Sequence, residues 1–137
     1  MTNNLPYPFN AAFEGGHSID YRCKDSKDHA YVIEHGFKPK MSSDCAYYAE
    51  GLSGFSLSSY GDWGTFFTNW AEDNDKEMFL DMVEKGIIEL WRIRAYIRKE
   101  GQNNPDTYDY DKDDGKWLTY DREKGKWVNC PDPFNEK

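Results

Sequence analysis

The sequence predicts an α+β fold, with a mixed or antiparallel sheet, two to three helices and a C-terminal β-meander. Helix signals fall early in the chain, whereas alternating and turn-rich segments cluster late, which is unlike the regular strand-helix alternation of a doubly wound fold. A ten-residue repeat near the C-terminus indicates consecutive hairpins. The length of 137 residues suits one core, so we expect residues 1–137 to form a single domain.

The N-terminal part is expected to hold a loop, a short strand and a helix. Prolines and glycines interrupt the first 20 residues, which favours a loop. Residues 20–23 follow as a short strand. A helix is predicted to begin near residue 25, to bury the apolar run 30–33 and to end at Gly36.

The middle of the chain is expected to hold a strand and two helices. Residues 54–59 alternate between apolar and serine side chains, and this period of two predicts a short strand. A second helix is predicted over residues 63–71. In a third helix, ending before Gly86, Asn74 and Glu77 resemble a capping box.

The period changes after Gly86. Apolar residues alternate with polar ones, mostly arginines, over residues 91–98, which predicts a half-buried strand with an arginine-rich outer face. One long helix over residues 75–99, running through Gly86, is the alternative.

The repeat runs from Tyr110 to Trp117 and again from Tyr120 to Trp127. Each copy predicts a strand, a turn with glycine at positive φ, and a second strand. A meander that closes a sheet is the simpler interpretation. The alternative is an aromatic surface for a ligand or partner, including a carbohydrate held by Trp117 and Trp127.

Composition excludes several classes of function. The chain has 17 basic and 25 acidic residues, a net charge of −8, and this argues against binding duplex nucleic acid or an anionic membrane. No apolar run is long enough to span a membrane, and no signal peptide is seen. We expect a monomer that is cytoplasmic, or secreted or delivered as an effector.

Cysteine and histidine give no metal signature. Three cysteines allow at most one disulfide and leave one thiol over. No spacing of cysteine and histidine matches a zinc site, so no metal is predicted.

Four short motifs suggest a family. They are the pair Tyr21-Arg22, the triplet Asp25-Ser26-Lys27, the segment Gly36–Pro39 at a helix end, and the serine-containing strand Gly54–Ser59. In this order the chain resembles the arginine-serine-glutamate class of mono-ADP-ribosyltransferases, which includes the cholera, pertussis, pierisin and scabin toxins. The resemblance covers residues 20–60, and Leu57 stands where the family has threonine.

The resemblance implies NAD as substrate and a role for each motif residue. Arg22 would hold the pyrophosphate, because a guanidinium binds phosphate bidentately. Ser56 and Ser58 would orient the ribose and the carboxylate, and Phe55 would stack on nicotinamide. Glu123 would be the catalytic carboxylate that stabilises an oxocarbenium-like transition state.

Some of these roles have alternatives. Tyr48 and Phe66 are other candidates for the stacking ring. The family's final motif is matched only by Asp121-Arg122-Glu123, within the repeat, and Glu100 is a substitute for its glutamate.

Three functions follow as hypotheses. The first is an NAD-dependent mono-ADP-ribosyltransferase of toxin or effector type, acting on a host protein or another macromolecular target. The second is a small acidic inhibitor that blocks a host nucleic-acid-binding machine, as phage anti-defence proteins do, because a negative surface competes for basic clefts. The third is a non-catalytic binding protein with the ADP-ribosyltransferase fold.

Overall fold

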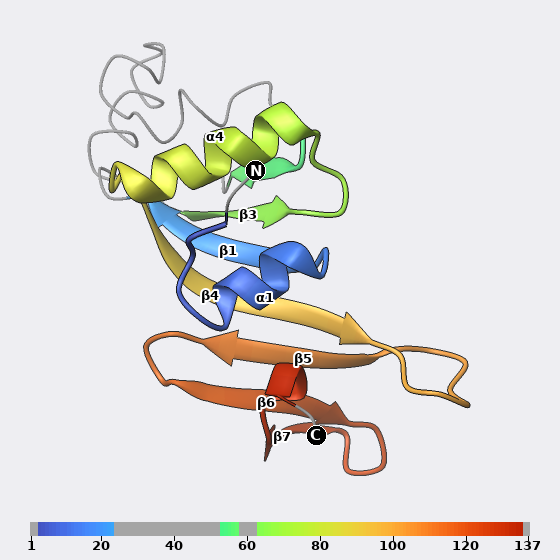
Figure 1. The fold of residues 1–137 in the computed structure, drawn as a ribbon. Helices are drawn as coiled ribbons and strands as arrows, with labels where there is room; N and C mark the ends of the chain where they lie inside the picture. Colours follow the sequence, from blue (N-terminus) through green and yellow to red (C-terminus); the bar gives the residue numbers. More distant parts are fainter. Residues whose placement is uncertain (1–2, 24–52, 58–62, 136–137) are drawn as a thin grey trace.

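The computed structural model describes residues 3–23, 53–57 and 63–135. Its elements, in chain order, are α1 (Phe9–Glu14), β1 (Ser18–Cys23), β2 (Phe55–Leu57), β3 (Trp63–Phe67), α4 (Asp73–Glu84), β4 (Ile88–Ile97), β5 (Asp106–Asp111), β6 (Lys116–Asp121), β7 (Lys126–Cys130) and the 3₁₀ turn η2 (Pro133–Asn135) (Figure 1).

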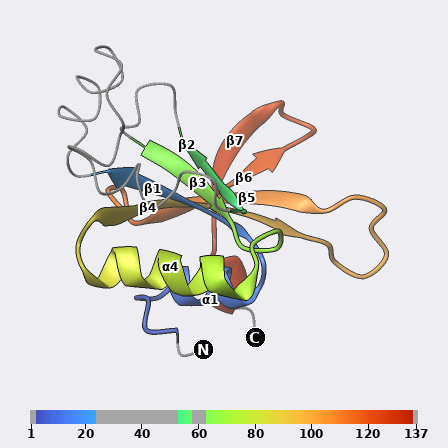
Figure 2. The ribbon, with the colours of Figure 1, turned by 90° about the horizontal axis from the view of Figure 1, so that it is seen from above.

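The described strands form one antiparallel sheet in the order β2-β3-β1-β4-β5-β6-β7. The helices α1 and α4 lie on the same side of this sheet, and β6 and β7 turn away from that side (Figure 2). The α+β class, the antiparallel sheet and the C-terminal meander are therefore confirmed.

The side chains of strand β1 alternate between the two faces of the sheet. Ile19, Tyr21 and Cys23 alternate with Ser18, Asp20 and Arg22, and only the first three are buried. The buried set faces the helices, which contribute Phe9 and Phe13 from α1 and Phe79 and Met82 from α4. The faces differ because successive side chains of a strand point in opposite directions.

The core is mainly aromatic. The rings of Phe66 and Phe79 stack at 4.3 Å with an angle of 6° between their planes. The ring of Phe13 lies beside this pair, 6.2 Å from that of Phe66 and 6.1 Å from that of Phe79. This packing joins both helices to β3, so the helix face is closed by ring contacts.

Helix α1 corrects the prediction of a loop over the first 20 residues. Pro8 occupies its N-cap position, and Phe9, Ala12 and Phe13 are buried. Their spacing of three and four residues is that of one helical face. In the sequence, the prolines and glycines around this single turn and a half obscured the signal.

Strand β3 corrects the prediction of a helix over residues 63–71. Gly64 explains why a strand fits here between β2 and β1. A Cβ atom at this position would lie 2.3 Å from the backbone oxygen of Ser56 and 2.7 Å from Oη of Tyr21. The close approach of these two neighbours requires glycine, and an isolated glycine in a strand often marks such an approach.

Helix α4 and strand β4 confirm the third helix and the alternating strand. The alternative of one helix over residues 75–99 is wrong, because Gly86 has a φ of +74° and ends the helix. The capping box is also wrong. Helix α4 has Glu72 at its N-cap without a side-chain cap, and Asn74 and Glu77 lie inside it.

The repeat forms two hairpins whose turns carry the predicted positive φ, +66° at Gly115 and +67° at Gly125. Tyr110 pairs across the strands with Trp117, and Tyr120 pairs with Trp127. The first pair faces the helices and the second faces away from them. The faces differ because Trp117 and Tyr120 are an odd number of residues apart on β6.

Several predictions concern other parts of the chain. The helix over residues 25–36 lies outside the described residues. Cys23 is disulfide-bonded and Cys130 is a free thiol, as the cysteine count allows. Among the described helices, none has the length and apolar character needed to cross a membrane.

The assignment of β3 as a strand predicts unequal effects at two neighbouring phenylalanines. Phe66 is fully buried on the helix face, whereas Phe67 lies on the opposite face. We expect Phe66→Ala to lower the free energy of unfolding by about 3–5 kcal/mol and Phe67→Ala by about 1 kcal/mol. Urea unfolding measures both values, and equal losses would contradict the assignment.

Candidate functional site

The sheet face opposite the helices forms an open groove of about 720 Å³. Its curvature is seen where the guanidinium carbon of Arg94, on β4, lies 5.6 Å from the ring centre of Trp127, on β7. Two strands lie between them, and in a flat sheet β4 and β7 would be about 14 Å apart. The strong coiling of the meander therefore makes this face concave, and we call it the open groove.

Ion pairs cross the floor of the open groove. Nε of Arg92 donates to Asp20 at 3.0 Å, and Oγ1 of Thr65 donates to the same carboxylate at 2.7 Å. Arg94 binds Asp109 through Nε and Nη2, both at 2.8 Å. The hydrogen bond to Asp109 raises the pKa of Arg94 above its usual range. Cross-strand pairing sets both contacts, because Arg92 is opposite Asp20 and Arg94 is opposite Asp109.

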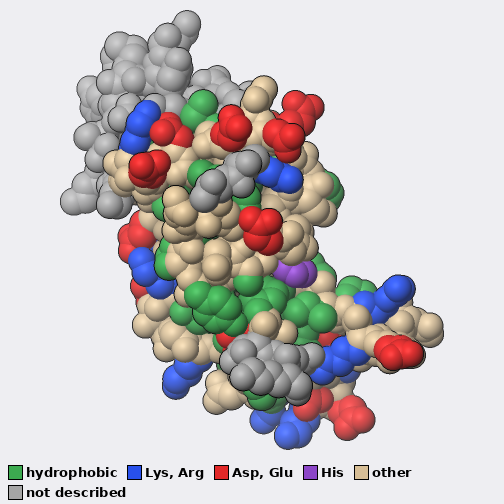
Figure 3. Space-filling view, in the orientation of Figure 1, with side chains coloured by type: hydrophobic (Ala, Val, Ile, Leu, Met, Phe, Trp, Pro, Cys, Tyr) green, Lys and Arg blue, Asp and Glu red, His purple; other side chains and the backbone are tan. Residues whose placement is uncertain are grey.

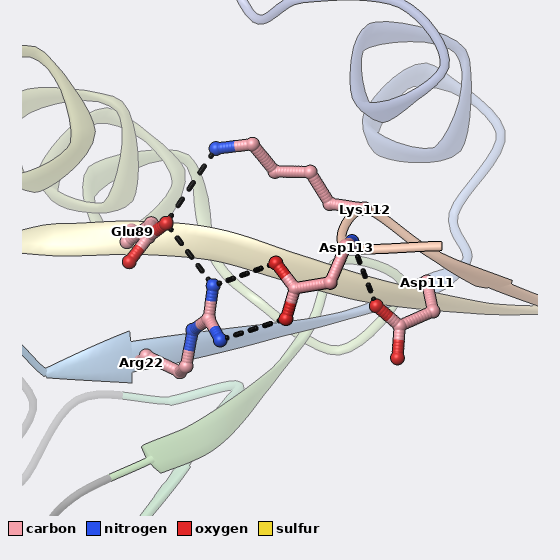
Figure 4. A network of polar contacts seen from close by, with 5 residues as sticks. All are labelled: Arg22, Glu89, Asp111, Lys112 and Asp113. Atoms are coloured by element: carbon pink, nitrogen blue, oxygen red, sulfur yellow. Dashed lines mark hydrogen bonds and ion pairs between the residues drawn. The ribbon is translucent and has the colours of Figure 1, made fainter. Parts of the chain in front are cut away.

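Arg22 is held by two carboxylates at one end of the face (Figure 4). Its Nη1 and Nη2 bind Asp113 at 3.0 and 3.3 Å, and Nη2 also binds Glu89 at 3.0 Å. Lys112 approaches the same oxygen of Glu89 at 3.7 Å. The hydrogen bond to Asp113 raises the pKa of the guanidinium, and the charge of Glu89 acts in the same direction.

Tryptophan rings lie close to the guanidinium groups of Arg22 and Arg92. The guanidinium carbon of Arg92 lies 3.7 Å from the ring centre of Trp91 and 5.5 Å from that of Trp63. Arg22 lies 5.3 Å from the same Trp91 ring. The four side chains form a stack of cation–π contacts, which are strengthened where the ring excludes water.

Three exposed aromatic side chains line the other end of the face. The exposed fractions are 51% for Tyr96, 42% for Tyr120 and 39% for Trp127. Tyr120 and Trp127 are cross-strand neighbours with ring centres 5.5 Å apart. Exposed aromatic rings gathered on one surface are typical of binding sites.

The residues predicted to bind NAD are partly brought together. Ser56 pairs with Thr65, which pairs with Asp20, so Ser56 shares the open face with Arg22, and β3 lies between their strands. Phe55 lies on the opposite face, with its ring 4.6 Å from that of Phe66 in the core. The alternative ring Phe66 is fully buried. Ser58 and Tyr48 lie outside the described residues.

Glu123 is not near Arg22. It lies in the turn between β6 and β7, where its N–H donates to Asp121. Arg22 contacts Asp113 in the turn at the other end of β6. A strand of this length spans about 17 Å. Glu100 lies in the exposed segment after β4, at the same end as Glu123. The structure therefore does not gather the predicted arginine and glutamate.

Sequence reasoning missed the tryptophan stack. The alternation over residues 91–98 predicts Trp91 on the inner face with Ile93. The register of β1 and β4 shifts between Asp20 and Tyr21, however, and at this bulge the Trp91 ring lies against the guanidinium of Arg92. Trp63 lies in the segment 63–71, for which the sequence predicts a helix, and the structure places it in β3. The arginine-rich outer face of β4 was the signal that pointed to this surface, and it is confirmed for Arg92 and Arg94.

Of the two tryptophans proposed for a carbohydrate, only Trp127 lies on the open face. Trp117 is buried and packs against Phe134 on the helix face. Among the described residues, no group of three or more His, Cys, Asp or Glu side chains is placed to hold a metal ion.

Comparison of the chain with models of protein families, with curated proteins and with solved structures finds no match. The resemblance to ADP-ribosyltransferases, in fold and in activity, therefore stays a prediction.

The ion pairs of the groove predict a measurable coupling. In a double-mutant cycle of Asp20→Asn and Arg92→Gln, the coupling energy between the two side chains, measured from unfolding free energies, should be about 1 kcal/mol. The pair is partly buried, and Arg92 stacks on a tryptophan ring. The matched control is Asp81 and Lys85 on α4, an exposed pair one turn apart that should give about 0.3–0.5 kcal/mol. A groove coupling no larger than the α4 coupling would contradict the account.

Proposed function

We propose that the chain is a small acidic inhibitor that binds a basic surface of a nucleic-acid-binding protein through the open groove. The observation that carries this proposal is the concave sheet face, which the described helices leave uncovered and which tryptophan, tyrosine and arginine line.

The side chains of this face support binding to a protein. Tryptophan, tyrosine and arginine are the residue types most enriched at the energetic centres of protein interfaces. Trp63 and Trp127 flank the groove, with Tyr96 and Tyr120 toward one end. Polar residues lie between these rings. They give the groove the mixed aromatic and polar composition of an interface whose surface is also stable in water when no partner is bound.

The ion pairs support a preorganised surface. Arg22, Arg92 and Arg94 are each fixed by a carboxylate and by a tryptophan ring. A fixed side chain loses less conformational entropy when a partner binds, which favours affinity. The surface is therefore suited to binding without large rearrangement.

The charge of the whole chain supports a basic partner. Six of the residues from 72 to 85 are acidic and two are lysines. Figure 3 shows these acidic side chains gathered over the part of the molecule where α4 lies. A field of this sign attracts a basic protein over a long range and raises the rate of association.

The proposal predicts a split between affinity and association rate. With the partner isolated from source-cell lysate, Trp127→Ala should weaken binding about tenfold through faster dissociation. Tyr7→Ala removes a more exposed aromatic side chain, just before α1, that does not line the groove, and it should leave binding unchanged. Association should slow with added salt in every variant. Surface plasmon resonance measures both rates, and an equal loss in the two variants would contradict groove binding.

The NAD-dependent transferase is the second candidate. The position of Arg22 and Ser56 on one face of the sheet supports it. The two carboxylates that hold Arg22 oppose it, because a pyrophosphate would have to displace them. A non-catalytic protein that holds NAD would share the same residues.

Labelled NAD separates the candidates. We expect the protein to leave NAD intact, alone and with lysate, because Glu123 lies far from Arg22. Turnover that disappears in both Arg22→Ala and Glu123→Gln would instead establish the transferase. Binding without turnover, lost in Arg22→Ala only, would establish the NAD-holding protein.

A further inference from the structure

We propose that residues 131–135, which we call the C-terminal strap, fix the position of the meander relative to β4, and that protonation of His17 releases them. The strap follows β7 and contains η2, which lies on the same side of the sheet as α1 (Figure 2). The open groove is on the other side, so the strap packs against the reverse of the strands that line it. The consequence for a partner rests on the proposed function, whereas the shape of the groove does not.

Phe134 attaches the strap to two distant strands. Its ring centre lies 5.2 Å from that of Trp117, which is buried on β6, and 5.5 Å from that of His17, just before β1. In the sheet, β4 and β5 lie between β1 and β6. Among the described residues, the one ring contact between an α-helix and the meander joins Phe9 of α1 to Tyr110 of β5. Phe134 is therefore the ring that supports β6 from the helix side.

His17 connects the strap to the groove. Its ring stacks on Phe134 with an angle of 29° between the planes. Its Nδ1 accepts the backbone N–H of Tyr96 at 3.4 Å, and Tyr96 lines the groove. On the other side, a Cβ atom at Gly15 would lie 2.9 Å from Cδ2 of the imidazole. The half-buried ring therefore contacts the end of α1, β4 and the strap, and a change in its charge affects all three.

Protonation of His17 would break its contact with β4. A ring nitrogen accepts a hydrogen bond only when it carries no proton, and both nitrogens of an imidazolium are donors. A protonated Nδ1 would therefore face the N–H of Tyr96 donor to donor. Burial lowers the pKa of His17 below its ordinary value of 6.5, so the folded protein binds this proton less readily than the unfolded chain. The contact is fully stable above about pH 6.5 and loses stability as the pH falls below it.

The charged groups of the described residues do not offset an imidazolium at this position. The titratable groups nearest in the chain to the contacts of His17 are Glu14 on α1, Arg94, Tyr96 and Arg98 along β4 and at its end, and Asp132 in the strap. Asp132 already accepts from the N–H of Phe134 at 2.8 Å and from Tyr7 at 2.5 Å. None of these groups contributes to the lowered pKa of His17, which burial alone explains. Among them, the charged ring therefore finds no carboxylate to pair with.

The shape of the groove can be measured at the side-chain Nε–H of Arg94, by NMR of the full chain. The guanidinium carbon lies 5.6 Å from the ring centre of Trp127, so this proton experiences the ring current of that indole. From about pH 7.5 to about pH 5, which spans the titration of histidine, its chemical shift should move toward the value in Trp127→Ala. The midpoint should equal the pKa of His17, measured from its ring protons in the same samples.

Two substitutions separate the effect of the proton from that of the strap. His17→Gln keeps an acceptor for the N–H of Tyr96 and does not titrate in this range, so the Arg94 shift should no longer depend on pH. Phe134→Ala removes the anchoring ring, so Arg94 should show the acid value of its shift already at neutral pH. Unchanged amide shifts in α4 verify that this variant is folded.

The matched controls leave the strap and its histidine intact. His29→Gln with His35→Gln removes the other two histidines of the sequence and should retain the pH dependence. Tyr7→Phe removes only the exposed hydrogen bond to Asp132, which competes with water, and should leave the Arg94 shift unchanged.

An Arg94 shift that does not respond to pH, or that responds equally in His17→Gln, would overturn the inference. A pKa of His17 at or above 6.5 would also overturn it, because stacking on Phe134 would then stabilise the imidazolium. An Arg94 shift that is the same in Phe134→Ala as in the parent protein would contradict the role of the strap. These measurements use no partner, so the inference can fail while the proposed function holds.

Discussion

The alternation of side chains along β1 is the constraint on which the rest of the structure depends. This strand lies between β3 and β4, so each of its residues must suit one face or the other. Tyr21 packs edge-on against Phe55 and Phe79 in the core. Asp20, the residue before it, holds Arg92 on the opposite face. A slip of one residue would bury the carboxylate and expose the tyrosine, so the core and the groove fix the same register.

The two faces solve different physical problems. The helix face closes by stacking aromatic rings, which bury much surface in a small protein. The open face remains in contact with water, and its charges cancel in pairs that contribute little to stability individually. Their consequence is geometric, because the guanidinium groups are held against Trp63, Trp91 and Trp127. The curvature of the meander then turns an ordinary polar sheet face into a groove.

Local periodicity predicted the elements whose signal lies within a few residues. The alternation of arginines with apolar residues predicted β4, and the glycine-containing turns of the repeat predicted the meander. The apolar face after residue 74 predicted α4. Strand β3 was not predicted, because the need for glycine at position 64 comes from contacts with Ser56 and Tyr21, which are distant in sequence. The tryptophan stack was not predicted, because it depends on a bulge in the pairing of β1 with β4. The separation of Glu123 from Arg22 likewise follows from strand order, which no local pattern contains.

The central claim is that the open groove, and not the acidic helix face, binds the partner. Hydrogen–deuterium exchange of the free and partner-bound protein tests it most directly, because exchange reports on each segment of the backbone. The account predicts that binding slows exchange in the hairpins β5–β6 and β6–β7 and leaves α4 unchanged. Slower exchange confined to α1 and α4 would contradict it.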